Sequence, residues 1–169
     1  MKQITLITTL FSILAILPLA TFAQQPTTAN EWFKLGNQQR ADRKLEDAIK
    51  SYSECIRLHS DQWECYGNRA ISYAALKKNN EALADFYKAI QLKPTESTIY
   101  NNRGNLLTNL GRYEDAKADL LKAVELNPNY AKAYKNLGDI YKELNEHEKA
   151  VSYFAKAVEI DPKYVSAYN

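Results

Sequence analysis

The sequence is poor in the residues on which most catalytic and metal sites depend. Its 169 residues include two histidines, two cysteines and five glycines. Neither His59 nor His147 has a cysteine or histidine partner at the spacing of a metal site. The sequence also lacks a glycine-rich phosphate loop and the nucleophile elbow of a hydrolase. We therefore predict no catalytic centre, no metal site and no cofactor.

The sequence has no concentration of charge of one sign. Its 22 Lys and Arg residues are nearly balanced by 20 Asp and Glu residues, and the formal net charge is +2 at pH 7. The two signs are mixed along the chain, with no basic block or stripe. Because nucleic acids and anionic membrane surfaces attract concentrated positive charge, we expect neither as a partner.

Long apolar runs are confined to the N-terminus. A short basic start, Met1-Lys2, precedes an apolar stretch that ends on small residues at Ala23. This pattern is typical of a secretory signal peptide over residues 1–23, cleaved after Ala23. The alternative is an N-terminal membrane anchor, since about 20 apolar residues suffice to span a bilayer. We expect an exported protein, periplasmic or secreted, with residues 24–28 as a flexible lead-in.

The sequence does have a 34-residue period, marked by four kinds of position. An aromatic residue recurs as Trp32, Tyr66, Tyr100 and Tyr134. Four residues later a small residue recurs as Gly36, Ala70, Gly104 and Gly138. Another small residue recurs as Ala48, Ala82, Ala116 and Ala150. The period closes on Ser60, Pro94, Pro128 and Pro162.

Within each period the marked residues have helical spacing. In the last copy, Tyr134, Gly138 and Tyr141 follow i, i+4, i+7, which places them on one face of a helix. Ala150, Phe154 and Ala157 do the same. Between the two trios, Asn145 can end the first helix, because asparagine tolerates a left-handed backbone. Each period therefore predicts a helix, a short turn and a second helix.

This pattern resembles the tetratricopeptide repeat (TPR) family, whose 34-residue unit carries an aromatic, Leu-Gly, an aromatic, Ala, an aromatic and Pro at these offsets. The resemblance implies an all-α solenoid, a right-handed superhelix of antiparallel helix pairs. It divides the chain into four repeats, over residues 29–62, 63–96, 97–130 and 131–164.

Residues 165–169 look like the start of an incomplete fifth helix. Solenoids usually finish with a capping helix that covers the last apolar face. Without one, the second helix of repeat four either pairs with another chain or forms a frayed end. The sequence leaves both alternatives open.

The resemblance also implies where a partner binds. In this family, certain positions of each first helix line a concave groove that holds an extended or helical peptide. Here the expected groove residues are Phe33, Asn37, Arg40, Ile71, Asn101, Asn105, Asn109, Lys132, Lys135 and Asp139. They predict a peptide with an apolar anchor near Ile71 and acidic character near Lys132 and Lys135. The alternative is that these are ordinary solvated helix positions.

Cys55 and Cys65 are the one specific cysteine pair. They lie on helices that this architecture packs side by side, in a chain with an export signal, where disulfides persist. A disulfide requires α-carbons within about 7 Å. Two buried thiols remain the alternative.

Three functions follow in order of support. We expect an exported scaffold that binds a protein or peptide in its groove and performs no catalysis. The alternative is an assembly protein that self-associates into a homo-oligomer through its last repeat. An enzyme would require a cluster of titratable groups in the groove, and the sequence offers no candidate for one.

Overall fold

Eight α-helices form the part of the chain that the structure describes, residues 25–167 of this computed structural model. In chain order they are α1 (Ala29–Ala41), α2 (Leu45–Leu58), α3 (Trp63–Ala75), α4 (Asn79–Leu92), α5 (Ser97–Asn109), α6 (Tyr113–Leu126), α7 (Ala131–Glu143) and α8 (His147–Ile160). A 3-10 helix, η1 (Pro162–Ala167), follows. The predicted signal peptide over residues 1–23 lies outside the described residues.

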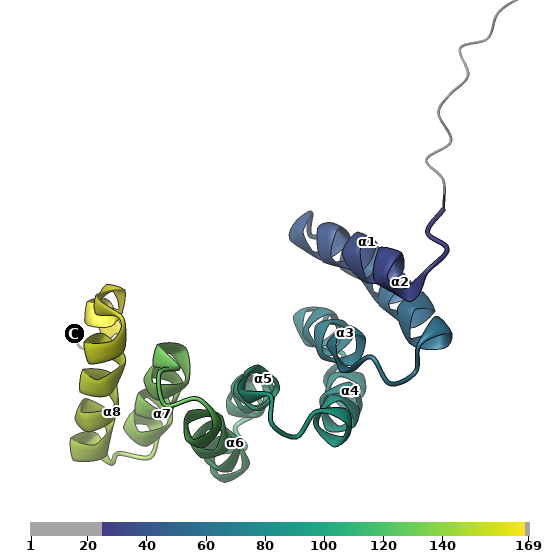
Figure 1. Ribbon diagram of the computed structural model, residues 1–169. Coiled ribbons are helices and arrows are strands. Elements are labelled where there is room, and N and C mark those ends of the chain that lie inside the picture. The colour runs from purple at the N-terminus through teal and green to yellow at the C-terminus, as the bar shows by residue number, and fades with distance from the viewer. Residues whose placement is uncertain (1–24, 168–169) are drawn as a thin grey trace, which may run out of the picture.

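The helices pack in consecutive antiparallel pairs. Each pair also packs against the next, so the four pairs form a curved array (Figure 1). The odd-numbered helices lie toward the inner side of the curve, and α2, α4 and α6 lie toward the outer side. Residues 25–167 contain no strand. The predicted all-α solenoid is therefore confirmed.

The turn inside each pair places one residue in the left-handed region. Arg43, Lys77, Gly111 and Asn145 have φ angles of 60°, 61°, 71° and 60°. The next residue then donates its N–H back into the first helix, as Lys44 does to the Gln39 carbonyl at 2.8 Å. This bond satisfies a carbonyl that the helix end would leave unpaired. The prediction that Asn145 ends the first helix of its pair is confirmed.

The two helices of a pair approach closely where the small residue recurs. A Cβ atom added at Gly138 would lie 2.5 Å from the Phe154 ring, and one at Gly36 would lie 2.6 Å from the Tyr52 ring. A side chain at these crossings would collide with the large residue of the facing helix. The small residue that recurs in each period therefore leaves room for a large side chain on the facing helix.

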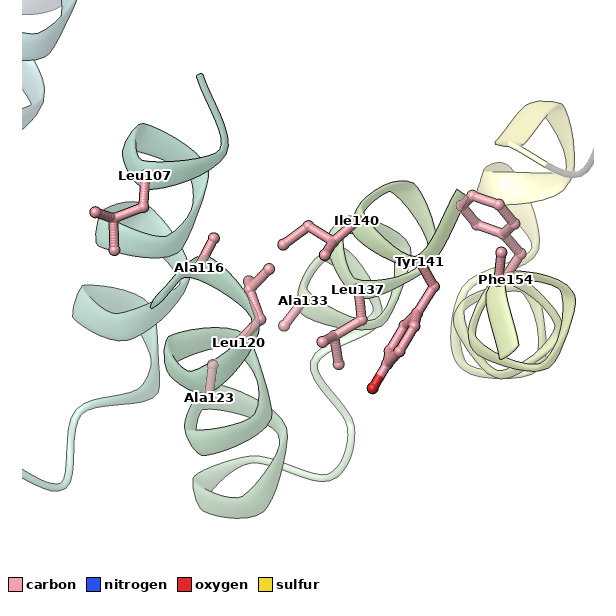
Figure 2. Packing of buried hydrophobic residues seen from close by; sticks show 10 residues of the cluster. Leu107, Ala116, Leu120, Ala123, Ala133, Leu137, Ile140, Tyr141 and Phe154 are labelled. Carbon is pink, nitrogen blue, oxygen red and sulfur yellow. The ribbon is translucent and has the colours of Figure 1, made fainter. Parts of the chain in front are cut away.

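The core runs along the array between the pairs. One cluster joins α3, α4 and α5 around Phe86. A second cluster, shown in Figure 2, joins α5 to α8 around Leu120, Leu137 and Ile140. These four side chains are buried almost completely. Burying a side chain of this size contributes about 1.5–3 kcal/mol. Because each cluster draws on several pairs, no pair buries its apolar face alone.

Candidate binding groove

Two adjoining hollows mark the inner side of the array, along the seam between α3 and α5. The larger has a volume of about 500 Å³ and the smaller about 140 Å³. Ile71, Phe86 and Asn102 line both. We call the two together the α3–α5 groove.

The walls of the groove come from one face of each helix. The α3 wall carries Trp63, Gly67, Ile71 and Ala74. The α5 wall carries Thr98, Asn102, Asn105 and Asn109. Both sets follow steps of three or four residues, which keep them on one helix face. Each helix has 13 residues, so the groove extends about 20 Å.

At the seams on either side of this groove, asparagines bond to each other. Asn68 on α3 donates to the Asn37 Oδ1 on α1 at 3.2 Å. That oxygen also accepts the Tyr52 hydroxyl at 2.8 Å. Asn136 on α7 donates to the Asn101 Oδ1 on α5 at 2.9 Å. These amides join neighbouring helix pairs, and their hydrogen-bonding capacity is partly used within the protein.

Asn101 was expected to line the groove, and the structure corrects this prediction. Its side chain is fully buried and engaged with Asn102 and Asn136, so it does not face the groove. The sequence assigned it to the groove from its position in the repeat. Its position in the repeat does not reveal that the side chain is buried and bonds to Asn136 of the next helix pair.

The α3–α5 seam lacks the equivalent bond. The acceptors at the other two seams are Asn37 and Asn101, and the residues 34 positions from them on α3 are Ile71 and Gly67. Neither has a side-chain group that could accept a hydrogen bond from Asn102. Asn105 and Asn109 are exposed, and their side chains bond to no other side chain in the described part of the protein. The inner wall therefore presents amide groups with free donors and acceptors at this seam.

Half of the expected groove residues meet at the larger hollow. The structure brings together five of them: Arg40, Ile71, Asn105, Asn109 and Lys132. Asn37 lies at the neighbouring seam, and Phe33 packs within the first pair, with its ring centroid 6.2 Å from that of Tyr52. Neither lines the larger hollow.

Lys135 and Asp139 pair with each other on α7. The Lys135 Nζ lies 2.5 Å from the Asp139 Oδ2. Neither residue lines either hollow of the groove. The positive charge of Lys135 is thus largely matched within the protein, whereas that of Lys132 is not.

Arg40 enters the groove beside a buried phenol. Burial raises the pKa of Tyr52, and the neighbouring Arg40 guanidinium opposes that rise. The Arg40 Nε is buried and has no hydrogen-bond partner among the described residues. The sequence had no signal for this buried, unpaired donor, because it depends on how α1 packs on α2.

The side chains that line the larger hollow can bind a ligand. Apolar, amide and basic side chains line the larger hollow, and its lining includes no carboxylate, histidine or cysteine. Across residues 25–167, no three His, Cys, Asp or Glu side chains are placed to hold a metal ion. Among the same residues, no helix combines the length and apolar character needed to cross a bilayer.

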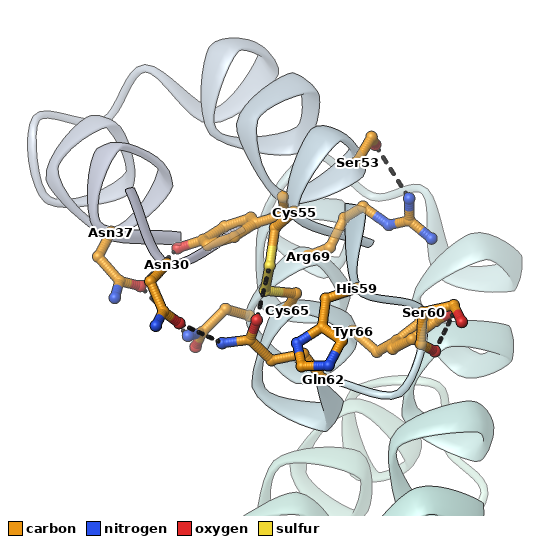
Figure 3. Close-up of a disulfide and its surroundings, with 12 residues drawn as sticks. Asn30, Asn37, Ser53, Cys55, His59, Ser60, Gln62, Cys65, Tyr66 and Arg69 are labelled. Atoms are coloured by element: carbon orange, nitrogen blue, oxygen red, sulfur yellow. Dashed lines mark hydrogen bonds between the residues drawn. A yellow bond between two sulfur atoms is a disulfide. The ribbon is translucent and has the colours of Figure 1, made fainter. Parts of the chain in front are cut away.

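A disulfide holds the helices next to the groove. Cys55 on α2 and Cys65 on α3 are bonded, with α-carbons 6.4 Å apart, and both are fully buried (Figure 3). Nearby, the Gln62 Nε2 donates to the Asn30 Oδ1 on α1 at 3.3 Å. These bonds fix α3, one wall of the groove, against the first helix pair.

Two stretches of the chain match models of one protein family. Residues 63–96 and residues 95–163 each match a model described as tetratricopeptide repeat. A curated human relative, sperm-associated antigen 1, is 37% identical over 57 residues. That match covers 31% of this chain and 6% of the relative.

Several solved structures have the same arrangement of helices. MamA is 26% identical, with a TM-score of 0.72 over 79% of this chain and 78% of its own. The first TPR of Spaghetti (RPAP3), solved bound to an HSP90 peptide, is 29% identical, with a TM-score of 0.67 over 70% of this chain and 94% of its own. PilF of Pseudomonas aeruginosa is 20% identical, with a TM-score of 0.78 over 83% of this chain and 65% of its own, which shows the fold alone.

Proposed function

Because the chain belongs to the tetratricopeptide repeat family, we propose that it is an exported scaffold that binds a segment of a partner protein in the α3–α5 groove, without catalysis. The family and its structural neighbours support a role in protein–protein interaction. We further propose that the partner binds in this groove, that the protein is exported and that it performs no catalysis.

The observation that carries the proposal is the interrupted asparagine network. At two seams of the inner wall, amides satisfy each other between helix pairs. At the α3–α5 seam the two acceptor positions are occupied by Ile71 and Gly67, and Asn105 and Asn109 are exposed. An amide both donates and accepts, which matches the N–H and C=O groups of a peptide backbone. Ile71, next to these amides, provides an apolar contact for a ligand side chain.

A related protein supports the mode of binding. The RPAP3 structure shows that a TPR domain with a similar arrangement of helices binds a peptide. The larger hollow has no carboxylate, histidine or cysteine, and its ionisable residues are one arginine and two lysines. Its lining therefore offers no pair of nucleophile and base, which supports the absence of catalysis.

The direct test is capture of partners from the envelope fraction of the exporting cell, with the mature chain as bait. Two groove variants, Ile71→Glu and Asn105→Ala, are run beside two matched controls. Val151→Glu places the same charge on a half-exposed apolar position of α8, and Asn80→Ala removes an exposed amide outside the groove. Circular dichroism confirms that all four variants fold.

We expect a captured protein to be lost with both groove variants and retained with both controls. Cross-linking of that partner should then map to α3 and α5. A partner that binds the groove variants as well as the parent chain would place the binding surface elsewhere. Cross-links confined to the outer helices would lead to the same conclusion.

Self-association is the second candidate function, favoured by one observation. Val151 is 50% exposed on α8, the last long helix of the described chain. An exposed apolar face at the end of a solenoid can be covered by another copy. Sedimentation at increasing protein concentration tests this: a dimer that Val151→Glu converts to a monomer supports it. A monomer at every concentration excludes it.

Export is supported by two features. The first 23 residues have the pattern of a signal peptide, and a buried disulfide fits an oxidising compartment. Intact mass of the protein recovered from the exporting cell is the test. We expect a chain that begins at Gln24. Recovery of the full-length chain in the membrane fraction would indicate an N-terminal anchor instead.

A further inference from the structure

The two ends of the α3–α5 groove differ in charge. Three ionisable residues line the larger hollow, and all three are cations: Arg40 of α1, Lys77 of the turn after α3, and Lys132 of α7. The smaller hollow, at the start of α3, has Glu64 as its one ionisable residue. The groove is therefore positive at one end and negative at the other.

The three cations are not matched by carboxylates within the described part of the protein. Elsewhere on the helices, lysines form ion pairs with carboxylates three or four residues away, as Lys122 does with Glu125. Arg40, Lys77 and Lys132 form no such pair with any described residue. Arg40 also buries its Nε without an acceptor. Because Arg40, Lys77 and Lys132 line the larger hollow without a carboxylate partner, acidic groups of a ligand could form charge-assisted hydrogen bonds with them.

The opposite end of the groove has space for an apolar side chain. A Cβ atom at Gly67 would have no other atom within 4 Å. Trp63, Ile71 and Ile99 surround this space, and Phe86, which is 1% exposed, lies at the seam beneath. The negative charge of Glu64 beside it disfavours an acidic residue at this end.

We propose that the groove selects a partner segment with an apolar residue at the Gly67 end and acidic side chains at the Arg40–Lys77–Lys132 end. This inference rests on the proposed function and adds the chemistry and orientation of the bound segment. The cations come from the first, second and fourth helix pairs, so several acidic side chains match their spread better than one terminal carboxylate. The groups recognised are therefore acidic side chains within the segment, and a free C-terminus is not required.

The test is selection of binding sequences from a phage-displayed library of random peptides by the mature chain. The same library is selected with the variant Arg40→Gln/Lys77→Gln/Lys132→Gln. A matched control, Arg43→Gln/Lys88→Gln/Lys93→Gln, removes one arginine and two lysines at exposed positions that do not line the groove. Selected sequences are then made as labelled peptides, each with a free and with an amidated C-terminus, and their affinities are measured by fluorescence anisotropy.

We expect the mature chain and the control to enrich peptides that carry clustered Asp or Glu residues and an apolar residue to one side of them. The groove variant should bind these peptides roughly tenfold more weakly, and their affinity should fall as salt is added. Amidation should leave the affinity unchanged.

Three results would overturn the inference. Enriched peptides without excess acidic residues, but with binding lost in Ile71→Glu, would leave the groove as a peptide site and remove the acidic ligand. Loss of binding on amidation would assign the cations to a terminal carboxylate. If no enriched peptide lost its binding in the Ile71→Glu variant, both this inference and the proposed function would be wrong.

Discussion

Arg103 on α5 donates two hydrogen bonds to the carboxylate of Asp119 on α6, from Nε and Nη2, each at 2.7 Å. The Asp119 side chain is 8% exposed and that of Arg103 is 22% exposed. Hydrogen bonding to Asp119 raises the pKa of Arg103, which keeps the guanidinium charged. The same pairing occurs 34 residues earlier between Arg69 and Asp85. Each of the two central helix pairs, α3 with α4 and α5 with α6, therefore contains one largely buried ion pair. The first and last helix pairs have no ion pair at this position.

We predict that Asp119→Ala destabilises the protein by roughly 2–4 kcal/mol, because it leaves the Arg103 charge partly buried without a partner. The control is Arg103→Leu/Asp119→Tyr, which copies the equivalent residues of the last pair, Leu137 and Tyr153. Replacing both charges removes the unpaired charge, so this double variant should lie within about 1 kcal/mol of the parent chain. Urea unfolding measures both, and equal losses in the two variants would contradict the argument.

The disulfide should stabilise the fold by restricting the unfolded chain. Its cysteines are ten residues apart, which corresponds to roughly 2–3 kcal/mol on the loop-entropy model. We expect Cys55→Ala/Cys65→Ala to lower the free energy of unfolding by about this amount. Adding reductant to the parent chain should have a similar effect, and reductant should not affect the double variant. Two reactive thiols in the folded protein without reductant would show that the bridge is absent.

A single methyl group at a helix crossing should be costly. Gly138→Ala places a Cβ 2.5 Å from the Phe154 ring, and overpacking of this kind costs roughly 1–3 kcal/mol. The matched control is Gly67→Ala, also within a helix, where the added Cβ meets no atom within 4 Å. It should stabilise the fold by about 0.5–1 kcal/mol, because alanine restricts the unfolded chain. Thermal unfolding distinguishes the two, and shifts of the same sign would refute the explanation.

The turns within the pairs offer a stabilising change. Arg43 has a φ of 60°, a conformation that costs an L-residue roughly 1 kcal/mol. Arg43→Gly removes this strain but increases the entropy of the unfolded chain, so we expect a net gain of about 0.5 kcal/mol. Gly111→Ala, at the equivalent turn with φ of 71°, should lose about 1 kcal/mol. Chemical denaturation measures both, and a gain from Gly111→Ala would be inconsistent with the strain.

The helices could be predicted because their determinants are local. Trp32, Tyr66, Tyr100 and Tyr134 keep a constant spacing, and helical periodicity follows from residues three and four apart in the chain. The pairing of helices could be predicted from the small residues at the crossings, since a small side chain is needed there only when another helix lies against it. The curved array then follows from stacking identical units.

The groove could be predicted only in part. Ile71, Asn105 and Asn109 were assigned from their positions in the repeat, and they do meet at one hollow. The same reasoning assigned Asn101, which is fully buried against the next helix pair. An amide has the same polarity whether it faces water or a neighbouring amide, so its letter in the sequence does not decide between them.

The amino-acid sequence by itself determined the family, the helices and their turns, because each of these depends on contacts within one 34-residue unit or on its repetition. The tertiary structure alone decided which amides bond to each other, that the Nε atom of Arg40 is buried without an acceptor, and which three cations line one hollow. These features join side chains from different helix pairs. Their geometry depends on how the pairs stack, and the spacing of residues along the chain does not contain that information.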